Sequence, residues 1–280
     1  MSNVLIPPTL LEHLANKLCI PWCGAGVSIP AGLPSWSGLV QAMVDAAKDN
    51  GLGETQQAEL KQMVEGRVYE DVIDFCRDFL GEGEYKNFLE RCIGAHQTPA
   101  ILHELVIQLP TPAMLTSNYD RLLETALTRK TNQLPVVLTA DDTQTLWRHF
   151  AKGVFFLLKV HGDIMRPNTV VLTSRDYTQH VFGNLPFMTF MQKLLLSHSI
   201  LFFGSSLSDI YMKRILEETT FMTGGVGMPH YALLPYCGPI RAKLLRDRYN
   251  ITAISYDPMT EGSHDKTLAS ILERILGALS

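Results

Sequence analysis

Four short segments contain residue types that could do chemistry, and each directly follows an apolar run. They are residues 24–28, 116–120, 161–163 and 204–207. The first reads Gly-Ala-Gly-Val-Ser and precedes a helical pattern that starts at Trp36. Glycines between a strand and a helix let the backbone approach a pyrophosphate, and the N–H groups of the helix start face the anion. Because ordinary turns also use two glycines, this segment alone favours a nucleotide site no more than a plain turn.

The elements that must position these segments alternate between strands and helices. Apolar runs predict strands at 18–23, 114–116, 135–138, 154–160, 199–203, 231–234 and 251–256. Amphipathic patterns predict helices at 120–127, 187–196, 209–218, 240–248 and 264–279. Runs that are apolar on both faces suit a parallel sheet covered by helices. The sequence therefore predicts a doubly wound, Rossmann-like α/β fold, with all four segments at the carboxyl edge of one sheet.

A long helical block interrupts this alternation. Residues 38–109 show no strand period, and the block is too long for a simple crossover helix between two strands. We therefore expect a single domain, in which residues 1–37 and 110–280 form the Rossmann-like core. The block at about 38–109 is expected to be an all-helical module inserted into that core.

Composition excludes several classes of function. The 280 residues have a net charge of −4, which gives no electrostatic case for nucleic acid as the main ligand. No apolar run is long enough to span a membrane, and the N-terminus lacks the features of a signal peptide, so we expect a cytoplasmic protein. The five cysteines are widely spaced, which indicates neither a metal site nor a disulfide framework.

Taken together and in this order, the four segments resemble the motifs of the sirtuin family. The shared features are a Gly-Ala-Gly-x-Ser loop with a downstream Gly-x-Pro, a Thr-x-Asn-x-Asp turn, a His-Gly turn and a Gly-Ser-Ser turn. They lie here at residues 24–28, 32–34, 116–120, 161–162 and 204–206. The resemblance covers residues 18–256, nearly the whole chain.

Two departures point to one branch of that family. Sirtuin deacylases carry a four-cysteine zinc ribbon between the His-Gly and Gly-Ser turns, whereas residues 162–203 contain no cysteine. The first motif also continues as Pro34-Ser35-Trp36, and the segment 173–177 reads Thr-Ser-Arg-Asp-Tyr. These features are similar to the bacterial sirtuin-like NAD hydrolases of anti-phage defence, which deplete cellular NAD once infection is sensed.

The resemblance implies roles for the polar residues of the second and third segments. His161 matches the family's catalytic histidine, and an imidazole suits a general base for a ribose hydroxyl or a water. Asn118 would position the ribose and the water, although it could instead cap the helix predicted from residue 120. Asp120 is either a carboxylate at that helix N-terminus or a contact to the nicotinamide end. Thr116 would shape the same pocket. Asp163 either bonds to the backbone within its turn or helps to shape the site.

The glycine and serine segments would bind the rest of the dinucleotide. Gly24, Ala25, Gly26 and Ser28 are expected to hold the pyrophosphate. Gly204, Ser205 and Ser206 are expected to hold phosphate and the adenosine ribose, unless the serines only cap the following helix. Pro34 and Trp36 either wall the nicotinamide pocket or anchor the helical block. The remaining histidines are interpreted as structural: His13, His96, His103, His149, His180, His198, His230 and His264.

The resemblance therefore implies an NAD+ glycohydrolase that cleaves the nicotinamide–ribose bond, with NAD as substrate and no metal. One alternative is an NAD-dependent protein deacylase or ADP-ribosyltransferase, which the missing zinc ribbon argues against. Another is a non-catalytic module that senses NAD or ADP-ribose. An NAD-destroying enzyme needs restraint, so we expect a homo-oligomer or a separately encoded partner, such as an Argonaute-like protein or a hexameric translocase. The outer surface of the block 38–109 is the expected contact.

Overall fold

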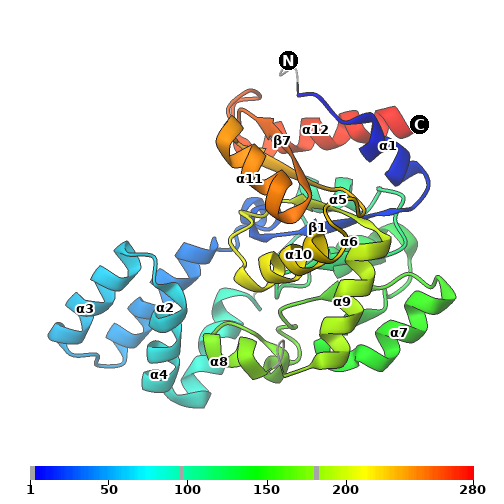
Figure 1. Ribbon diagram of the computed structural model, residues 1–280. Helices are drawn as coiled ribbons and strands as arrows, with labels where there is room; N and C mark the ends of the chain where they lie inside the picture. Colours follow the sequence, from blue (N-terminus) through cyan, green and yellow to red (C-terminus); the bar gives the residue numbers. More distant parts are fainter. Residues whose placement is uncertain (1–3, 95–96, 180–182) are drawn as a thin grey trace.

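The computed structural model describes residues 4–94, 97–179 and 183–280, and it is built around one parallel sheet (Figure 1). Its strands lie in the order β3-β4-β2-β1-β5-β6-β7. They are β1 (Cys19–Cys23), β2 (Met114–Thr116), β3 (Val137–Thr139), β4 (Leu157–Lys159), β5 (Ser199–Phe203), β6 (His230–Pro235) and β7 (Ile251–Tyr256). The prediction of a doubly wound, Rossmann-like sheet is confirmed. The order reverses at β1, which opens a crevice beyond its carboxyl end.

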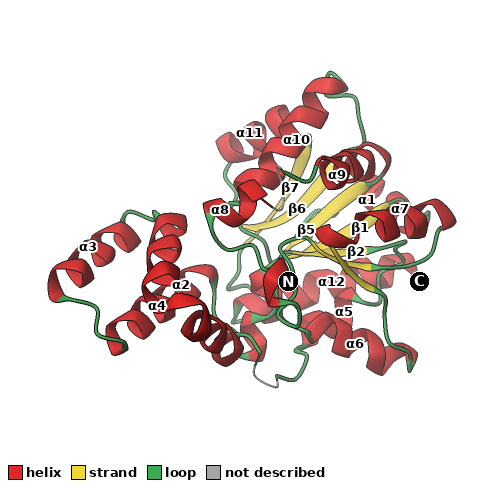
Figure 2. Cartoon of the chain, turned by 90° about the horizontal axis from the view of Figure 1, so that it is seen from below, coloured by secondary structure: helices red, strands yellow, loops and turns green. Residues whose placement is uncertain are grey.

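Helices cover both faces of the sheet (Figure 2). One face packs against α1 (Pro8–Ala15), α5 (Ile101–Val106), α6 (Leu122–Thr131) and α12 (His264–Leu279). The other packs against α7 (Thr143–Lys152), α9 (Leu185–Ser197), α10 (Ile210–Met222) and α11 (Pro239–Tyr249). Strand β1 is buried throughout, with Cys19 and Cys23 in the first core and Ile20 and Trp22 in the second. This two-sided burial explains why the central strands read as continuous apolar runs.

Three helices project to one side of the sheet and form the module (Figures 1 and 2). They are α2 (Trp36–Asp49), α3 (Glu54–Glu65) and α4 (Tyr69–Cys92), which is kinked at Gly81. They share a hydrophobic core to which Ile164, Val170 and Leu172 of the core domain also contribute. Helix α5 also falls within residues 38–109, yet it packs on the sheet beside α6 and α12. The helices of that block that pack away from the sheet are therefore α2, α3 and α4.

The module is tied to the core domain through the short helix α8 (Ser174–Tyr177). Arg77 of α4 donates to Asp176 at 2.7 Å, and Arg175 lies 3.5 Å from Asp78 of α4. Helix α8 also carries Tyr177, whose ring packs against His161. The module and one wall of the crevice are thus joined by the same short element.

Two strand predictions were longer than the strands observed. The run 154–160 forms a ladder only over Leu157–Lys159, and the run 135–138 is shifted to Val137–Thr139. Strand β4 lies between β2 and β3, which offer three partners each, so its remaining apolar residues have no ladder to join. Within the described residues, no helix is long and apolar enough to cross a membrane.

Candidate active site

A cleft of about 960 Å³ opens at the carboxyl ends of β1 and β5. Its volume lies within the usual range for small-molecule sites. The structure brings nearly all of the predicted site residues to its walls: Gly24, Ala25, Gly26, Ser28, Pro34, Trp36, Asn118, Asp120, His161, Gly204, Ser205 and Ser206. Thr116 is buried and does not line the cleft.

The two glycine segments form the floor of the cleft by packing directly on each other. Gly26 N–H donates to Gly204 O at 2.8 Å, and Gly24 N–H donates to Phe203 O at 3.0 Å. A Cβ at Gly24 would lie 2.6 Å from Gly204 O, and Gly204 itself has φ +62°. Side chains at these positions would separate the loops, so the glycines are required by the backbone contact itself.

The helix after the first segment begins at Trp36, as predicted, but the chain between Gly24 and Trp36 is not a plain loop. Two 3₁₀ turns, Ala25–Val27 and Ile29–Ala31, precede α2, because Pro30 and the αL residue Gly32 interrupt the path. The N–H groups of Gly24 and Gly26 already donate to backbone oxygens, so they are not available to a ligand. Within the described part of the chain, those of Ala25, Ser205 and Ser206 carry no hydrogen bond. These three amides are therefore free hydrogen-bond donors at the floor of the cleft.

Asn118 belongs to a buried hydrogen-bond network beneath the cleft. Its Nδ2 donates to Gly24 O at 3.1 Å and to Ser28 Oγ at 3.0 Å. Ser28 Oγ in turn donates to Asp120 Oδ2 at 2.9 Å, and His103 Nε2 lies 3.3 Å from the same Oγ. Asn118 does not cap a helix, because α6 begins at Leu122, whose N–H donates to Asp120 Oδ1. Asp120 therefore both receives the N–H of that helix start and joins the site network.

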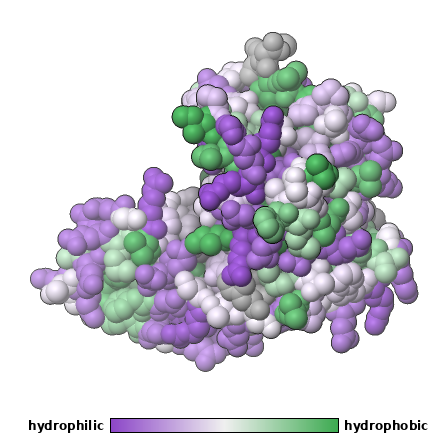
Figure 3. All heavy atoms as spheres, viewed as in Figure 1, coloured by the Kyte–Doolittle hydropathy of each residue, from purple (hydrophilic) through white to green (hydrophobic). Residues whose placement is uncertain are grey.

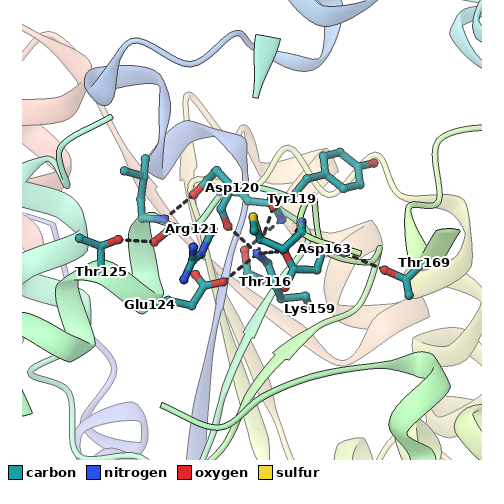
Figure 4. Close-up of polar contacts among 12 residues, drawn as sticks. Thr116, Tyr119, Asp120, Arg121, Glu124, Thr125, Lys159, Asp163 and Thr169 are labelled. Carbon is teal, nitrogen blue, oxygen red and sulfur yellow. Dashed lines mark hydrogen bonds and ion pairs between the residues drawn. The ribbon is translucent and has the colours of Figure 1, made fainter. Parts of the chain in front are cut away.

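A buried lysine holds the turn that carries Asn118 and Asp120 (Figure 4). Lys159 Nζ, at the end of β4, donates to the carbonyl oxygens of Tyr119 and Asp120, and it pairs with Glu124 at 2.8 Å and Asp163 at 3.1 Å. The Lys159 side chain is fully buried. Burial raises the pKa of Glu124, and the charge and hydrogen bond of Lys159 oppose that rise.

Thr116 and Asp163 support the site from behind. Thr116 Oγ1 donates to Cys23 O and accepts from the N–H of Asn118, which fixes the start of the turn. Asp163 pairs with Lys159 and accepts from Met165 N–H, so it acts in the turn rather than in the cleft. Both residues position the chain, and neither lines the cleft.

His161 lies across the cleft and is paired with a carboxylate. Its Nε2 is 2.8 Å from Asp209 Oδ2, and its ring meets that of Tyr177 edge-on at 5.3 Å. Asp209 caps α10 through Tyr211 N–H and Met212 N–H, so Ser205 and Ser206 do not. Burial raises the pKa of Asp209, but His161 and these two N–H donors outweigh it and hold that pKa below its ordinary value. A histidine oriented by a carboxylate is the arrangement of a general base.

Trp36 and Pro34 combine the two roles that the sequence left open. Both line the cleft, and Trp36 also packs against the core of the module. Ser35 caps α2 by accepting from Gly38 N–H at 3.1 Å. The Pro34-Ser35-Trp36 segment therefore anchors the module and forms a wall of the cleft.

Three residues of the site escaped the sequence reasoning: His103, Asp209 and Tyr177. His103 had been interpreted as structural, yet it contacts Ser28 at the centre of the network. Asp209 carried one signal, since an aspartate before a helical run is a typical N-cap. His103 carried no local signal, because its contact with Ser28 depends on how α5 packs. Tyr177 ends the segment 173–177 noted for the resemblance, but no role in the site was given to it. His96 and His180 lie outside the described residues.

The chain is similar in sequence to a known domain family and to several curated proteins. Residues 112–254 match a family model described as a SIR2-like domain. The chain is 27% identical over 243 residues to the NAD(+) hydrolase ThsA of Cytobacillus dafuensis, covering 86% of this chain and 44% of that protein. It is 26% identical over 221 residues to ThsA of Acinetobacter baumannii (strain 532279), covering 78% and 42%. It is 24% identical over 212 residues to defense-associated sirtuin 2 of Bacillus subtilis, covering 74% and 20%.

The chain thus spans less than half the length of these curated relatives. Among solved structures, the crystal structure of a Sir2 homolog–NAD complex matches with a TM-score of 0.52 and 12% identity. That match covers 100% of this chain and 98% of the other. At this identity the likeness shows a shared fold.

Proposed function

Because the chain belongs to the SIR2-like domain family, we propose that it is an NAD+ glycohydrolase that cleaves the nicotinamide–ribose bond. The observation that carries this proposal is the placement of Asn118 and His161 on a cleft whose floor is the Gly24–Gly204 contact. The names of the ThsA relatives as NAD(+) hydrolases support it.

The cleft suits a dinucleotide in both size and chemistry. The unpaired N–H groups of Ala25, Ser205 and Ser206 offer donors to a pyrophosphate. Asn118 uses both Nδ2 hydrogens on Gly24 and Ser28, which leaves Oδ1 as its free polar atom. An amide oxygen there would orient a ribose hydroxyl or a water by accepting a hydrogen bond.

In the proposed reaction, the bond between ribose C1′ and the ring nitrogen of nicotinamide breaks. Its electron pair leaves with neutral nicotinamide, and positive charge develops on the ribose. The oxygen of water then bonds to C1′, and one proton is released, which gives ADP-ribose. Such a reaction depends on orientation and charge stabilisation more than on a strong acid.

Asn118 and His161 are the residues proposed to perform this chemistry. The Asn118 Oδ1 dipole would stabilise the developing positive charge and orient the water. In a neutral His161 whose Nε2–H donates to Asp209, Nδ1 is the basic nitrogen that accepts the released proton. Asp209 keeps the ring in that tautomer, as a carboxylate does in a catalytic triad.

The test is release of nicotinamide from NAD+ by the purified protein, measured by chromatography. We expect Asn118→Ala and His161→Ala to lower the rate by about 100-fold or more, the usual effect of losing an acid–base or orienting group. Asn87→Ala and His149→Ala, which change the same residue types outside the cleft, should retain the wild-type rate. The proposal fails if neither the wild-type protein nor its oligomer or partner complex releases nicotinamide.

Two other results would assign the site differently. Nicotinamide release that requires an acylated lysine peptide would indicate a deacylase. NAD+ that stabilises the fold without being consumed would indicate a sensing module, with about 2.7 kcal/mol of stabilisation at a ligand concentration of 100 Kd.

The proposed setting is bacterial anti-phage defence in the cytoplasm. The name of the Bacillus subtilis relative, a defense-associated sirtuin, supports the role in defence. Uncontrolled NAD+ cleavage would harm the host cell. We therefore propose that self-association, or a separately encoded partner, restrains or triggers the enzyme. The module α2–α4 is the proposed contact, because its hydrophobic side chains reach the surface (Figure 3).

A further inference from the structure

The donors and acceptors in the buried hydrogen-bond network around Asn118 can be assigned, starting from the two ring nitrogens of His103. Ala100 N–H donates to His103 Nδ1 at 3.1 Å, so Nδ1 must carry a lone pair. Burial lowers the pKa of His103, although the charge of Asp120 opposes the shift, which favours the neutral ring. A neutral imidazole has one N–H, so His103 carries its proton on Nε2. His103 therefore donates to Ser28 Oγ, 3.3 Å away.

Ser28 then has every hydrogen-bonding position occupied. A hydroxyl has one proton and two lone pairs. The Ser28 proton goes to Asp120 Oδ2 at 2.9 Å, since a carboxylate only accepts. The two lone pairs receive His103 Nε2–H and Asn118 Nδ2, which is 3.0 Å away. With the other tautomer of His103, Nε2 would compete with Asp120 for the Ser28 proton.

This arrangement determines how the Asn118 amide is turned. Ser28 Oγ and Gly24 O both require donors, so Nδ2 faces them and Oδ1 faces away. The proton order thus runs from Ala100 N–H through His103 and Ser28 to Asn118. Inverting the amide would place Oδ1 against two oxygen acceptors, and each contact would be repulsive.

We propose that His103 is a positioning residue for NAD+ hydrolysis, which fixes the Ser28 proton and so holds Asn118 Oδ1 toward the cleft. The proposal rests on the proposed function, because its consequence is a faster chemical step. His103 does not line the cleft, so it would act only through Ser28. Its loss should therefore lower kcat and leave KM for NAD+ nearly unchanged.

Two substitutions separate this role from a structural one, because each keeps one of the two His103 contacts. His103→Asn keeps an acceptor where Nδ1 meets Ala100 N–H, but it removes the donor to Ser28. His103→Gln keeps a donor where Nε2 meets Ser28, but it removes the cap of α5. We expect the Asn variant to lose up to about 100-fold in kcat, the effect of a slightly misplaced catalytic group. The Gln variant should stay within a few-fold of wild-type kcat while unfolding at lower urea concentration.

Three outcomes would overturn the proposal: equal kcat in both variants, a reversed order, or a change in KM alone. A wild-type protein that hydrolyses no NAD+ refutes the proposed function instead, so the two failures are distinguishable. A measurement on the wild-type protein covers the case in which the Asn variant does not fold. Nitrogen-15 NMR of labelled histidine, assigned with the Gln variant, should show His103 as the Nε2–H tautomer. An Nδ1–H tautomer or a charged ring would refute the proton order.

Discussion

At the scale of single residues, Lys159 has the largest share of polar contacts under the site. Its ammonium group is fully buried and serves two carbonyl oxygens and two carboxylates (Figure 4). Because the carbonyls belong to Tyr119 and Asp120, the lysine fixes the turn that begins at Asn118. A buried charge of this kind stabilises the fold only while its partners remain paired.

Removing the charge of Lys159 should therefore lower the stability of the fold. We expect Lys159→Met to lower the free energy of unfolding by about 3–5 kcal/mol, because Glu124 and Asp163 would be left buried and unpaired. Lys86→Met is the matched control, since Lys86 pairs with Glu82 at 2.7 Å on the surface. That change should cost less than about 1 kcal/mol. Urea denaturation of both variants makes the comparison, and equal losses would contradict this account of Lys159.

At the scale of elements, the site residues are positioned by the turns that follow the strands, and these turns depend on close backbone packing. Gly162 follows His161 with φ +89°, and a Cβ there would lie 2.0 Å from Thr169 O. Gly162 packs closely on the backbone of residues 169–170, which fixes the turn next to His161. The ring of His161 is fixed at its other end by Asp209. Glycine at 162 is thus required by conformation and by space.

The two requirements can be separated by mutation. Gly153 also has a positive φ, +62°, but a Cβ added there meets nothing within 4 Å. We expect Gly153→Ala to cost only about 1 kcal/mol, the usual strain of an alanine with positive φ. Gly162→Ala should cost several times more, because the backbone must also move away from Thr169, and it should slow nicotinamide release by displacing His161. Denaturation and activity would be measured on both variants, and similar losses in the two would exclude the steric argument.

The arrangement of the elements also explains which site residues and strand ends could be predicted from the sequence and which could not. Gly24, Asn118, His161 and Gly204 were predictable because each follows an apolar strand, and parallel strands bring their carboxyl ends to one edge. The ends of β4 were not predictable, because the length of a paired strand is limited by the strands beside it and not only by its own composition. His103 was hidden because it meets Ser28 across 75 positions of sequence. Such a contact depends on the packing of α5, which no local pattern records.

At the scale of the whole molecule, the module presents a hydrophobic face that the core domain leaves uncovered. Phe75 and Phe79 of α4 stack at 6.3 Å and are 37% and 38% exposed. Two adjacent aromatic rings at a surface are typical of contact sites between proteins. We proposed self-association through this module, and these rings are the residues that should carry it.

Light scattering after size exclusion tests that proposal. The wild-type protein should have a mass above the 31.3 kDa of one chain, and the double variant Phe75→Ser, Phe79→Ser should return to a monomer. Phe221→Ser, on α10 and away from the module, is the control and should leave the mass unchanged. A wild-type protein that remains at the mass of one chain would exclude self-association as the means of control.

The position of β1 also has a consequence for synthesis of the protein. Strand β1 is completed early, but one of its two neighbours is β5, which pairs from Cys19 with Ser199 to Cys23 with Phe203. A growing chain on the ribosome therefore exposes an unpaired edge of its central strand until β5 has been made. The floor of the cleft needs Gly204 against Gly24, so it cannot form earlier. In an enzyme proposed to destroy NAD+, a growing chain that has not reached Gly204 therefore lacks the floor of its active site.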